Sequence, residues 1–358
     1  MIIDLLIQSA LLFFLTFVLL KIFIHYSKSV GLIDIPNERS AHKEPIARGA
    51  GIVFGAVFLI TIISFYLFTS HDYHYSYIFL ALFIVYLTGV YDDFNDINSK
   101  KKFLFIMLAT LFACFDGLTI NSLGGYLGYE LSLGYFALPF TIFAVVGFTN
   151  ALNLTDGLDG LAGSISIVIL TSLVYIGYKN ADPILIYVPL FLIAPLLAFL
   201  YFNWYPATVF MGDSGSLFLG FSISMLSIYA LEYINPSSIL FLAAIPLLDT
   251  LMVIRRRKQR GQSVFIADKN HLHHILLGFK KDKMFTVASL LKLQIVFALI
   301  FMQVYDKSNF INLVLFLILF SIFFTLFDPR MNYRKKKKKK KKLQNTQNTQ
   351  TTTEEPKL

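Results

Sequence analysis

The chain has 358 residues, of which 56% are hydrophobic and 15% are charged, whereas a soluble globular domain is about half apolar and about a quarter charged. Eight consecutive lysines at positions 335–342 supply most of the net charge of +9. No folded basic domain accompanies this run, so a solvated tail drawn to anionic membrane lipid is favoured over a nucleic-acid site.

Apolar residues are gathered in long runs, which indicates membrane-spanning helices of about 20 residues each. The first run contains Asp4 and lacks a basic region and a cleavage site, so we expect a retained span rather than a signal peptide. In chain order, the predicted spans are Leu5–Ile24, Ala50–Phe68, Tyr77–Val90, Phe103–Ile120, Phe136–Phe148, Ala162–Tyr178, Ile184–Phe202, Leu217–Tyr229, Ile239–Ile254, Phe285–Val304 and Phe310–Phe327. The fold is therefore predicted to be all-α and polytopic. Residues 1–333 form a bundle of about eleven transmembrane helices, and residues 334–358 form a disordered lysine-rich tail.

The distribution of basic residues predicts how these spans are oriented. If the C-terminus lies in the cytoplasm, 27 of the 31 Lys and Arg residues fall in cytoplasmic segments and only two in the opposite loops. This asymmetry agrees with the positive-inside rule. We therefore expect the functional loops on the cytoplasmic face and the N-terminus in the periplasm.

Unusual polar residues collect at the cytoplasmic ends of the spans, where ionisable groups are candidates for function. Asp92, Asp93 and Asp96 follow the third span. Adjacent carboxylates repel each other and persist where a cation or a shared proton compensates, although a solvated helix end is the plain alternative. Asp34 and Arg39 stand in the Pro- and Gly-rich loop after the first span, and an ordinary connector explains them equally well.

Two further cytoplasmic segments supply hard oxygen ligands. Asn153, Asp156 and Asp159 lie in a run with two Asp-Gly steps, and such ligands suit Mg²⁺, which shares its coordination shell with water and phosphates. Asp213 stands between glycines at the start of the eighth span, where exposed backbone amides could meet a phosphate. A serine nucleophile at Ser214 is poorly supported, since no nucleophile elbow surrounds it.

The last polar segment carries basic and imidazole groups. Arg255 and Arg256 close the ninth span, and positive-inside topology alone could explain them. Topology does not explain His271, His273 and His274. A zinc site is disfavoured, because no carboxylate or thiol stands at a spacing familiar from zinc sites. We therefore favour contact of these side chains with phosphate or sugar groups.

Over about residues 31–280, these motifs in combination resemble the polyprenyl-phosphate N-acetylhexosamine-1-phosphate transferases, which include MraY of peptidoglycan synthesis. The histidine string favours the WecA-like branch. The motifs are Asp92-Asp93 with Asp96, Asn153-Leu-Thr-Asp156-Gly-Leu-Asp159-Gly, Phe210-Met-Gly-Asp213 and His271-Leu-His273-His274.

The resemblance implies an enzyme of the bacterial inner membrane that transfers N-acetylhexosamine-1-phosphate, most often GlcNAc-1-phosphate, from a UDP-sugar to undecaprenyl phosphate. UMP is released, and the product primes an envelope polysaccharide such as O-antigen. The family is also compatible with a homodimer. The implied roles are metal ligation of Mg²⁺ or Mn²⁺ by Asn153 and Asp213, catalysis by Asp92, Asp93, Asp96, Asp156 and Asp159, and donor binding by His271, His273, His274, Arg255 and Arg256.

Three alternatives stay open. Within the enzyme class, the donor could be the UDP-MurNAc-pentapeptide of peptidoglycan synthesis. The mechanism could pass through a covalent aspartyl-phosphate rather than by direct attack, with Asp92 or Asp93 as nucleophile instead of base. A cation-coupled transporter is a different class, but its charged groups should lie near the middle of the bilayer rather than at the ends of the spans.

Overall fold

The computed structural model describes residues 2–36, 44–68, 76–259, 261 and 271–327. The chain forms two compact units, residues 1–316 and 317–358; in the second, only the end of the last helix is described. The longer helices are α1 Ile2–Tyr26, α2 Gly51–Phe68, α3 Ser76–Asn95, α4 Ser99–Phe115, α5 Ala137–Thr155, α6 Leu161–Asn180, α7 Pro183–Asn203, α8 Asp213–Tyr229, α10 Ala244–Gln259, α12 Lys283–Val304 and α13 Asn309–Phe327. Short helices are α9 Ile239–Leu242 and α11 Leu272–Lys280, with 3-10 turns η1 Gly134–Phe136, η2 Ala230–Glu232 and η3 Pro236–Ser238. The predicted tail at 334–358 lies outside the described residues.

The helices confirm a polytopic all-α membrane protein but not the count of eleven spans. Among the described residues, nine helices are long and apolar enough to cross a membrane, and a bent pair would make a tenth. The predicted span Phe103–Ile120 corresponds to α4, which has 17 residues and ends at Phe115. The predicted span Ile239–Ile254 is interrupted, because η3 and α9 meet α10 at 86°.

A buried glutamine accounts for the break between α9 and α10. The side-chain amide of Gln294 donates to the carbonyl of Leu242 at 2.9 Å, and its oxygen accepts from the amide of Ile245 at 3.2 Å. A backbone group freed at a helix break inside a membrane needs such a partner, since no water is available there. The long side chain from α12 therefore takes the place of the missing helical hydrogen bonds.

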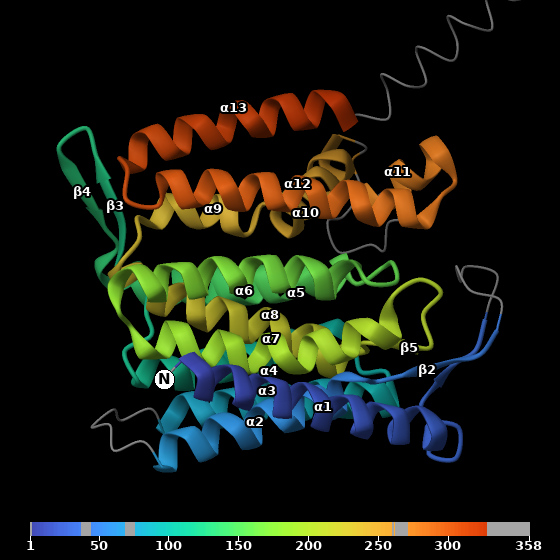
Figure 1. Ribbon diagram of the computed structural model, residues 1–358. Helices are drawn as coiled ribbons and strands as arrows, with labels where there is room; N and C mark the ends of the chain where they lie inside the picture. Colours follow the sequence, from blue (N-terminus) through green and yellow to red (C-terminus); the bar gives the residue numbers. More distant parts are fainter. Residues whose placement is uncertain (1, 37–43, 69–75, 260, 262–270, 328–358) are drawn as a thin grey trace, which may run out of the picture. The chain divides into compact units, whose positions relative to one another are not determined.

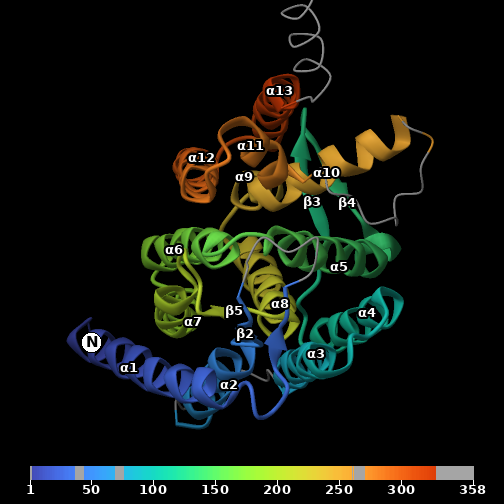
Figure 2. The same ribbon diagram turned by 90° about the vertical axis from the view of Figure 1, so that its right-hand side faces the viewer.

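Helix α8 is the centre of the packing in residues 1–316. Every one of its residues from Ser214 to Ile228 is buried, and α2, α3, α5 and α6 pack against it. The view along the helices in Figure 2 places α8 in the middle of this group. A helix that is covered on all sides can be apolar all round. Between Ser214 and Ile228, the sequence of α8 is apolar apart from small Ser residues.

Small residues let the neighbouring helices approach the first turn of α8 closely. A Cβ added to Gly51, at the start of α2, would lie 1.9 Å from the amide nitrogen of Gly215, and one added to Gly89 of α3 would lie 2.5 Å from the Cα of Ser214. No larger residue fits at either position without moving backbone. These contacts bring the ends of α2 and α3 to the point where Asp213 begins α8.

Two short sheets, which were not predicted, complete the fold of residues 1–316. In the first, β1 (Ile33–Asp34) pairs antiparallel with β2 (Ile46–Arg48), which pairs parallel with β5 (Val209–Phe210). The second is a hairpin of β3 (Ser122–Tyr126) and β4 (Tyr129–Ser132), at the opposite ends of the helices (Figure 1). Because Arg48 pairs with Phe210 in the first sheet, the loop after α1 is tied to the segment that leads into Asp213.

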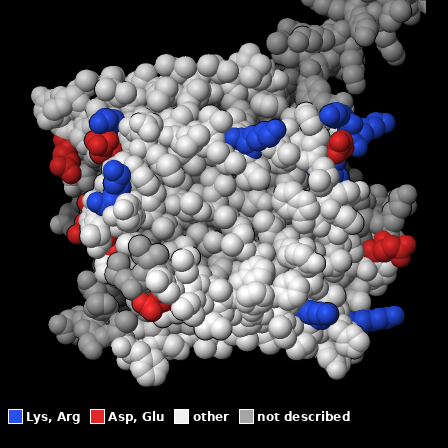
Figure 3. All heavy atoms as spheres, in the orientation of Figure 1, with Lys and Arg blue, Asp and Glu red and all other residues white. Residues whose placement is uncertain are grey.

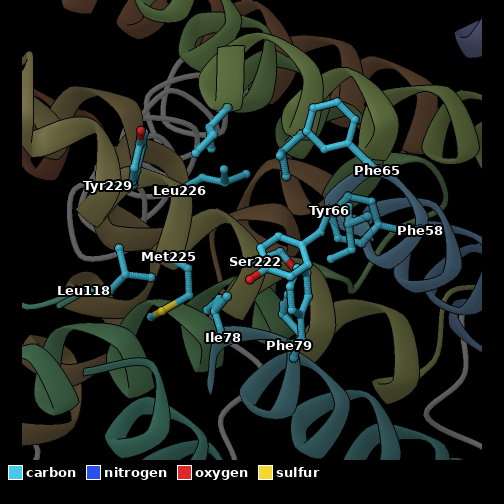
Figure 4. A pocket seen from close by; sticks show the side chains of 14 residues that line it. Phe58, Phe65, Tyr66, Ile78, Phe79, Leu118, Ser222, Met225, Leu226 and Tyr229 are labelled. Atoms are coloured by element: carbon cyan, nitrogen blue, oxygen red, sulfur yellow. The ribbon is translucent and has the colours of Figure 1, made fainter. Parts of the chain in front are cut away.

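Charged side chains of residues 2–316 gather toward the two ends of the helices on the face drawn in Figure 3, with a broad belt between them that carries little charge. This is the pattern of a surface that faces lipid. A cavity of about 120 Å³ between α2, α3, α7 and α8 is lined almost wholly by apolar side chains such as Phe58, Phe79 and Met225 (Figure 4). It lacks the charged groups that phosphate chemistry requires.

Candidate functional site

A polar cavity of about 360 Å³, called the site cavity below, lies at the end of the helices where α5 ends and α8 begins. Its lining includes Arg48 from β2, Asn153 from α5, Asp159 from the following turn, Asp213 from α8 and Lys283 from α12. These residues are spread over more than 200 positions of the chain. Folding therefore brings together groups from five different elements, as a site for a multiply charged ligand needs.

Asp213 is the centre of the contacts at this cavity. The side-chain amide of Asn153 donates to Asp213 Oδ1 at 3.0 Å and to the hydroxyl of Ser216 at 2.7 Å. The ammonium group of Lys102 contacts Asp213 Oδ2 and, at 2.7 Å, Asp92 Oδ2. The predicted pair of Asn153 and Asp213 thus lies together, and one lysine stands between two carboxylates that would otherwise repel each other.

Asp93 holds the start of α8 in place. Its side chain is wholly buried, its Oδ1 accepts from the amide of Asp213 at 2.8 Å, and its Oδ2 accepts from the amide of Ser214 at 3.1 Å. Carboxylates are favoured at this position because the first amides of a helix lack intrahelical partners and carry the positive end of its dipole. The expectation that these amides face a phosphate is therefore wrong, since Asp93 already binds them.

Arg48 connects the sheet to the acidic group. Its Nε donates to Asp93 Oδ1 and its Nη2 donates to Asp96 Oδ1, each at 3.3 Å. Burial alone would lower the pKa of Arg48, but the negative charges of Asp93, Asp96 and Asp213 outweigh it and raise that pKa. Asp96 is mostly exposed, with 85% of its side chain accessible, so it belongs to the rim of the group rather than its centre.

The turn between α5 and α6 carries Asp156 and Asp159. Asn203, which is buried, holds this turn to β5: its side-chain oxygen accepts from the amide of Gly160 and its nitrogen donates to the carbonyl of Val209, both at 2.8 Å. Asp159 Oδ2 lies 3.9 Å from the ammonium of Lys283. Burial within the site, together with the negative charges of Asp213, Asp93 and Asp159, raises the pKa of Asp156 to about 7.

The three predicted histidines stand at the start of α11, beside that turn. A Cβ added to Gly157 would lie 2.5 Å from Nε2 of His273, so this ring touches the turn directly. Burial, followed by the neighbouring His274 and His271, lowers the pKa of His273 to about 4. His271 is also buried, whereas His274 is exposed.

The predicted donor-binding arginines lie farther along α10 and do not line the site cavity. Arg255 is exposed, whereas Arg256 is buried and its Nη2 donates to the sulfur of Met252 at 3.8 Å. Their assignment to donor binding stays a prediction. Helix α10 also carries Asp249, to which the sequence reasoning assigned no role in the site and whose carboxylate binds His271.

The sequence reasoning also omitted Lys102, Asn203 and Lys283 from the site. Lys102 is the last of three consecutive lysines, and only the packing of α4 shows which of the three turns toward Asp213. Asp249 did leave a signal, since it is a carboxylate inside an otherwise apolar predicted span.

The donor set around Asp213 suits a hard divalent cation. The carboxylates of Asp213 and Asp92 and the amide of Asn153 offer oxygen ligands, and Lys102 shows that a positive charge is stable between the two carboxylates. Within the described residues, no group of three or more His, Cys, Asp or Glu is arranged to enclose a metal. Few protein ligands are typical of Mg²⁺ that completes its shell with water and substrate phosphates.

Comparison with known proteins matches residues 75–231 to the family model described as glycosyl transferase family 4. A probable undecaprenyl-phosphate N-acetylglucosaminyl 1-phosphate transferase of Bacillus subtilis (strain 168) is 31% identical over 294 residues, 81% of each chain. An undecaprenyl-phosphate alpha-N-acetylglucosaminyl 1-phosphate transferase of Yersinia pestis is 30% identical and covers 73% of this chain and 74% of its own. A phospho-N-acetylmuramoyl-pentapeptide-transferase of Kosmotoga olearia is 31% identical and covers 77% of this chain and 92% of its own. The family resemblance is thereby confirmed: this multi-pass membrane protein belongs to glycosyl transferase family 4.

Proposed function

We propose that this protein transfers N-acetylglucosamine-1-phosphate from UDP-N-acetylglucosamine to undecaprenyl phosphate and releases UMP. The names of the Bacillus and Yersinia relatives support this sugar and this acceptor. The observation that carries the proposal is the cluster of Asp92, Lys102, Asn153 and Asp213 at the site cavity. It combines carboxylates for a cation with cations for phosphates, as transfer between two phosphorylated substrates needs.

A second cavity supports a lipid acceptor. It has a volume of about 880 Å³ and lies among α4, α5, α8 and α10, and its almost entirely apolar lining includes Lys100. Asn150 of α5 lines this apolar cavity, whereas Asn153 lines the site cavity. Residues three apart on a helix are neighbours, so an isoprenoid chain lying in the apolar cavity has its phosphate within reach of the site.

Asp213 and Asn153, with Asp92 beside them, would hold Mg²⁺, or Mn²⁺ in its place. The bound ion would neutralise negative charge that builds on the leaving UMP. With an ion held there, the ammonium group of Lys102 would no longer be needed to compensate Asp213 and could bind a phosphate oxygen. Arg48 and Lys283, which both line the site cavity, would orient the diphosphate of the donor.

The reaction is a displacement at phosphorus. An oxygen of the lipid phosphate forms a bond to the β-phosphorus of the donor, and the bond between that phosphorus and the bridging oxygen breaks, leaving with UMP. If the lipid phosphate still carries a proton, Asp92 accepts it. Both oxygens of Asp93 are engaged by the first amides of α8, which favours direct attack over an aspartyl-phosphate at that residue.

The orientation of the chain follows from the same proposal. UDP-sugars are made in the cytoplasm, so the site would open to the cytoplasmic face of the bacterial inner membrane. The excess of Lys and Arg in the loops at that end agrees with this placement. The N-terminus would then lie on the periplasmic side, and the product would prime an envelope polysaccharide.

The test is UMP release by the purified full-length protein in detergent with undecaprenyl phosphate, Mg²⁺ and a panel of UDP-sugars. We expect UMP only when lipid and UDP-N-acetylglucosamine are both present. Turnover with UDP-MurNAc-pentapeptide alone would instead assign the activity of the Kosmotoga relative. A folded protein that releases no UMP with any donor would refute the transferase and favour ion-coupled transport.

A further inference from the structure

Asp249 is a buried carboxylate whose two oxygens both bind the start of α11. Its Oδ1 accepts from the amide of Leu272 at 2.6 Å, and its Oδ2 lies 3.0 Å from Nδ1 of His271. Asp249 and His271 are 4% and 7% exposed. The carboxylate, which comes from α10, therefore caps a helix that begins 23 residues later.

This geometry decides which imidazole nitrogen carries the proton. The amide of Leu272 donates to Oδ1, and a carboxylate offers acceptors, so the geometry favours a proton on Nδ1 of His271 that is donated to Oδ2. Any contact of His271 with a substrate is then made through Nε2. A carboxylate that binds the far nitrogen of a functional histidine is a recurrent way to fix both tautomer and ring orientation.

The same contact also sets the position of a second ring. His271 and His273 lie nearly parallel, with ring centroids 5.8 Å apart and an interplanar angle of 8°. His273 in turn touches Gly157, in the turn that carries Asp156 and Asp159. A shift at Asp249 would therefore pass through α11 to the wall of the site cavity.

We propose that Asp249 is a positioning residue that holds His271 with its proton on Nδ1 and seats the histidines of α11 against the turn at Gly157. The turnover assay that tests this role rests on the proposed transferase function, whereas the NMR measurement of the His271 tautomer does not.

The first test is NMR of isotope-labelled histidine in the full-length protein, with His271→Ala to assign the signal. His271 should be protonated at Nδ1. In Asp249→Asn the amide oxygen should stay on Leu272, so that the amide nitrogen faces His271 and moves the ring proton to Nε2. A wild-type His271 protonated at Nε2 alone would overturn the proposal, whether or not the protein proves to be a transferase.

The second test is a double-mutant cycle on turnover, for a protein in which UMP release has been established. Asp249→Asn and His271→Ala should each lower kcat/KM by about 10- to 100-fold, and the double variant should be no worse than the worse single variant. Asp249→Glu, which keeps the acceptor, should recover part of the loss. Losses that multiply in the double variant, or no recovery with Glu, would show that Asp249 does not act through His271.

Asp182→Asn is the matched control, because Asp182 is another buried carboxylate that caps a helix but lies outside the site. It accepts from the amide of Leu185 at 2.8 Å and from the hydroxyls of Tyr229 and Tyr233. Its loss should lower the thermal stability of the protein and leave kcat/KM within about threefold of wild type. An equal loss of turnover in both variants would overturn a specific role for Asp249.

Discussion

The two ends of α8 both hold buried carboxylates, but their charges are compensated in different ways. At the first turn, Asp92, Asp93 and Asp213 share the side chains of Lys102 and Arg48. At the last turn, the donors to Asp182 among the described residues are uncharged, namely the amide of Leu185 and the hydroxyls of Tyr229 and Tyr233. In the first cluster, Asp213 and Arg48 line the site cavity, whereas Asp182 joins the start of α7 to the end of α8.

The difference teaches how to distinguish a functional carboxylate from a structural one when both are buried. The partners of Asp182 are a backbone amide and two aromatic side chains, and packing holds these groups in fixed positions. Lys102 is a long and flexible cation that another positive charge can replace. A cluster that depends on such a partner is ready to exchange it for a metal ion or to give it to a phosphate.

Among the changes that test this comparison, removal of divalent metal should have the largest effect on turnover. With EDTA in excess, UMP release should disappear completely, because Lys102 alone cannot neutralise both the acidic cluster and the leaving phosphate. Mg²⁺ should restore it, and Mn²⁺ should restore at least part. The readout is UMP release during a metal titration. Full turnover in the presence of EDTA would contradict a metal-dependent site.

Asp213→Asn should come next, with a loss of turnover of about 10³-fold. The variant keeps the size of the side chain but removes the charge that would hold the metal. Turnover should be measured over a wide range of Mg²⁺, and part of the loss should be recovered at high concentration. Normal activity at ordinary Mg²⁺ would contradict the ligand role of Asp213.

Lys102→Ala should lower turnover by about 10²-fold, because the diphosphate loses one cation and the carboxylates of Asp92 and Asp213 lose their common partner. Lys101→Ala is the matched control, since Lys101 is exposed one residue away on the same helix. It should retain the turnover of the wild type. Equal losses in the two variants would mean that the basic run acts as a whole and not through Lys102.

Asp182→Asn should have the smallest effect on turnover and should affect stability instead. One amide oxygen must serve three donors, so we expect a loss of about 1–3 kcal/mol and a lower Tm in detergent. The measurement is thermal unfolding of the purified protein beside the kinetic assay. A variant of unchanged stability that had lost turnover would reverse the comparison between the two ends of α8.

Sequence reasoning located most of the cluster but not the hydrogen bonds within it. The family resemblance paired Asn153 with Asp213, and the structure brings their side chains into contact, whereas their role as metal ligands stays a prediction. The roles within the acidic pair were not separable, since Asp92 and Asp93 are adjacent and chemically identical. Only the packing of α3 on α8 shows that Asp93 binds the first amides of α8 while Asp92 faces Lys102.

The fold shows the same division. The apolar runs predicted the long helices, because a backbone in lipid must satisfy its own hydrogen bonds. They did not predict the break between α9 and α10, which depends on the side chain of Gln294 from a helix some 50 residues away in the chain. Nor did they predict the small sheet of β1, β2 and β5, whose strands have two or three residues each.

The sequence by itself determined that this is a polytopic membrane protein, where its polar groups collect and which family it resembles. Those properties depend on residue type and spacing along the chain, which local hydrophobicity and motif order express directly. Tertiary structure alone decided which of three lysines enters the acidic cluster, which aspartate caps α8 and how Asp249 meets His271. These contacts join residues 10 to 120 positions apart, and their geometry depends on how closely the helices pack.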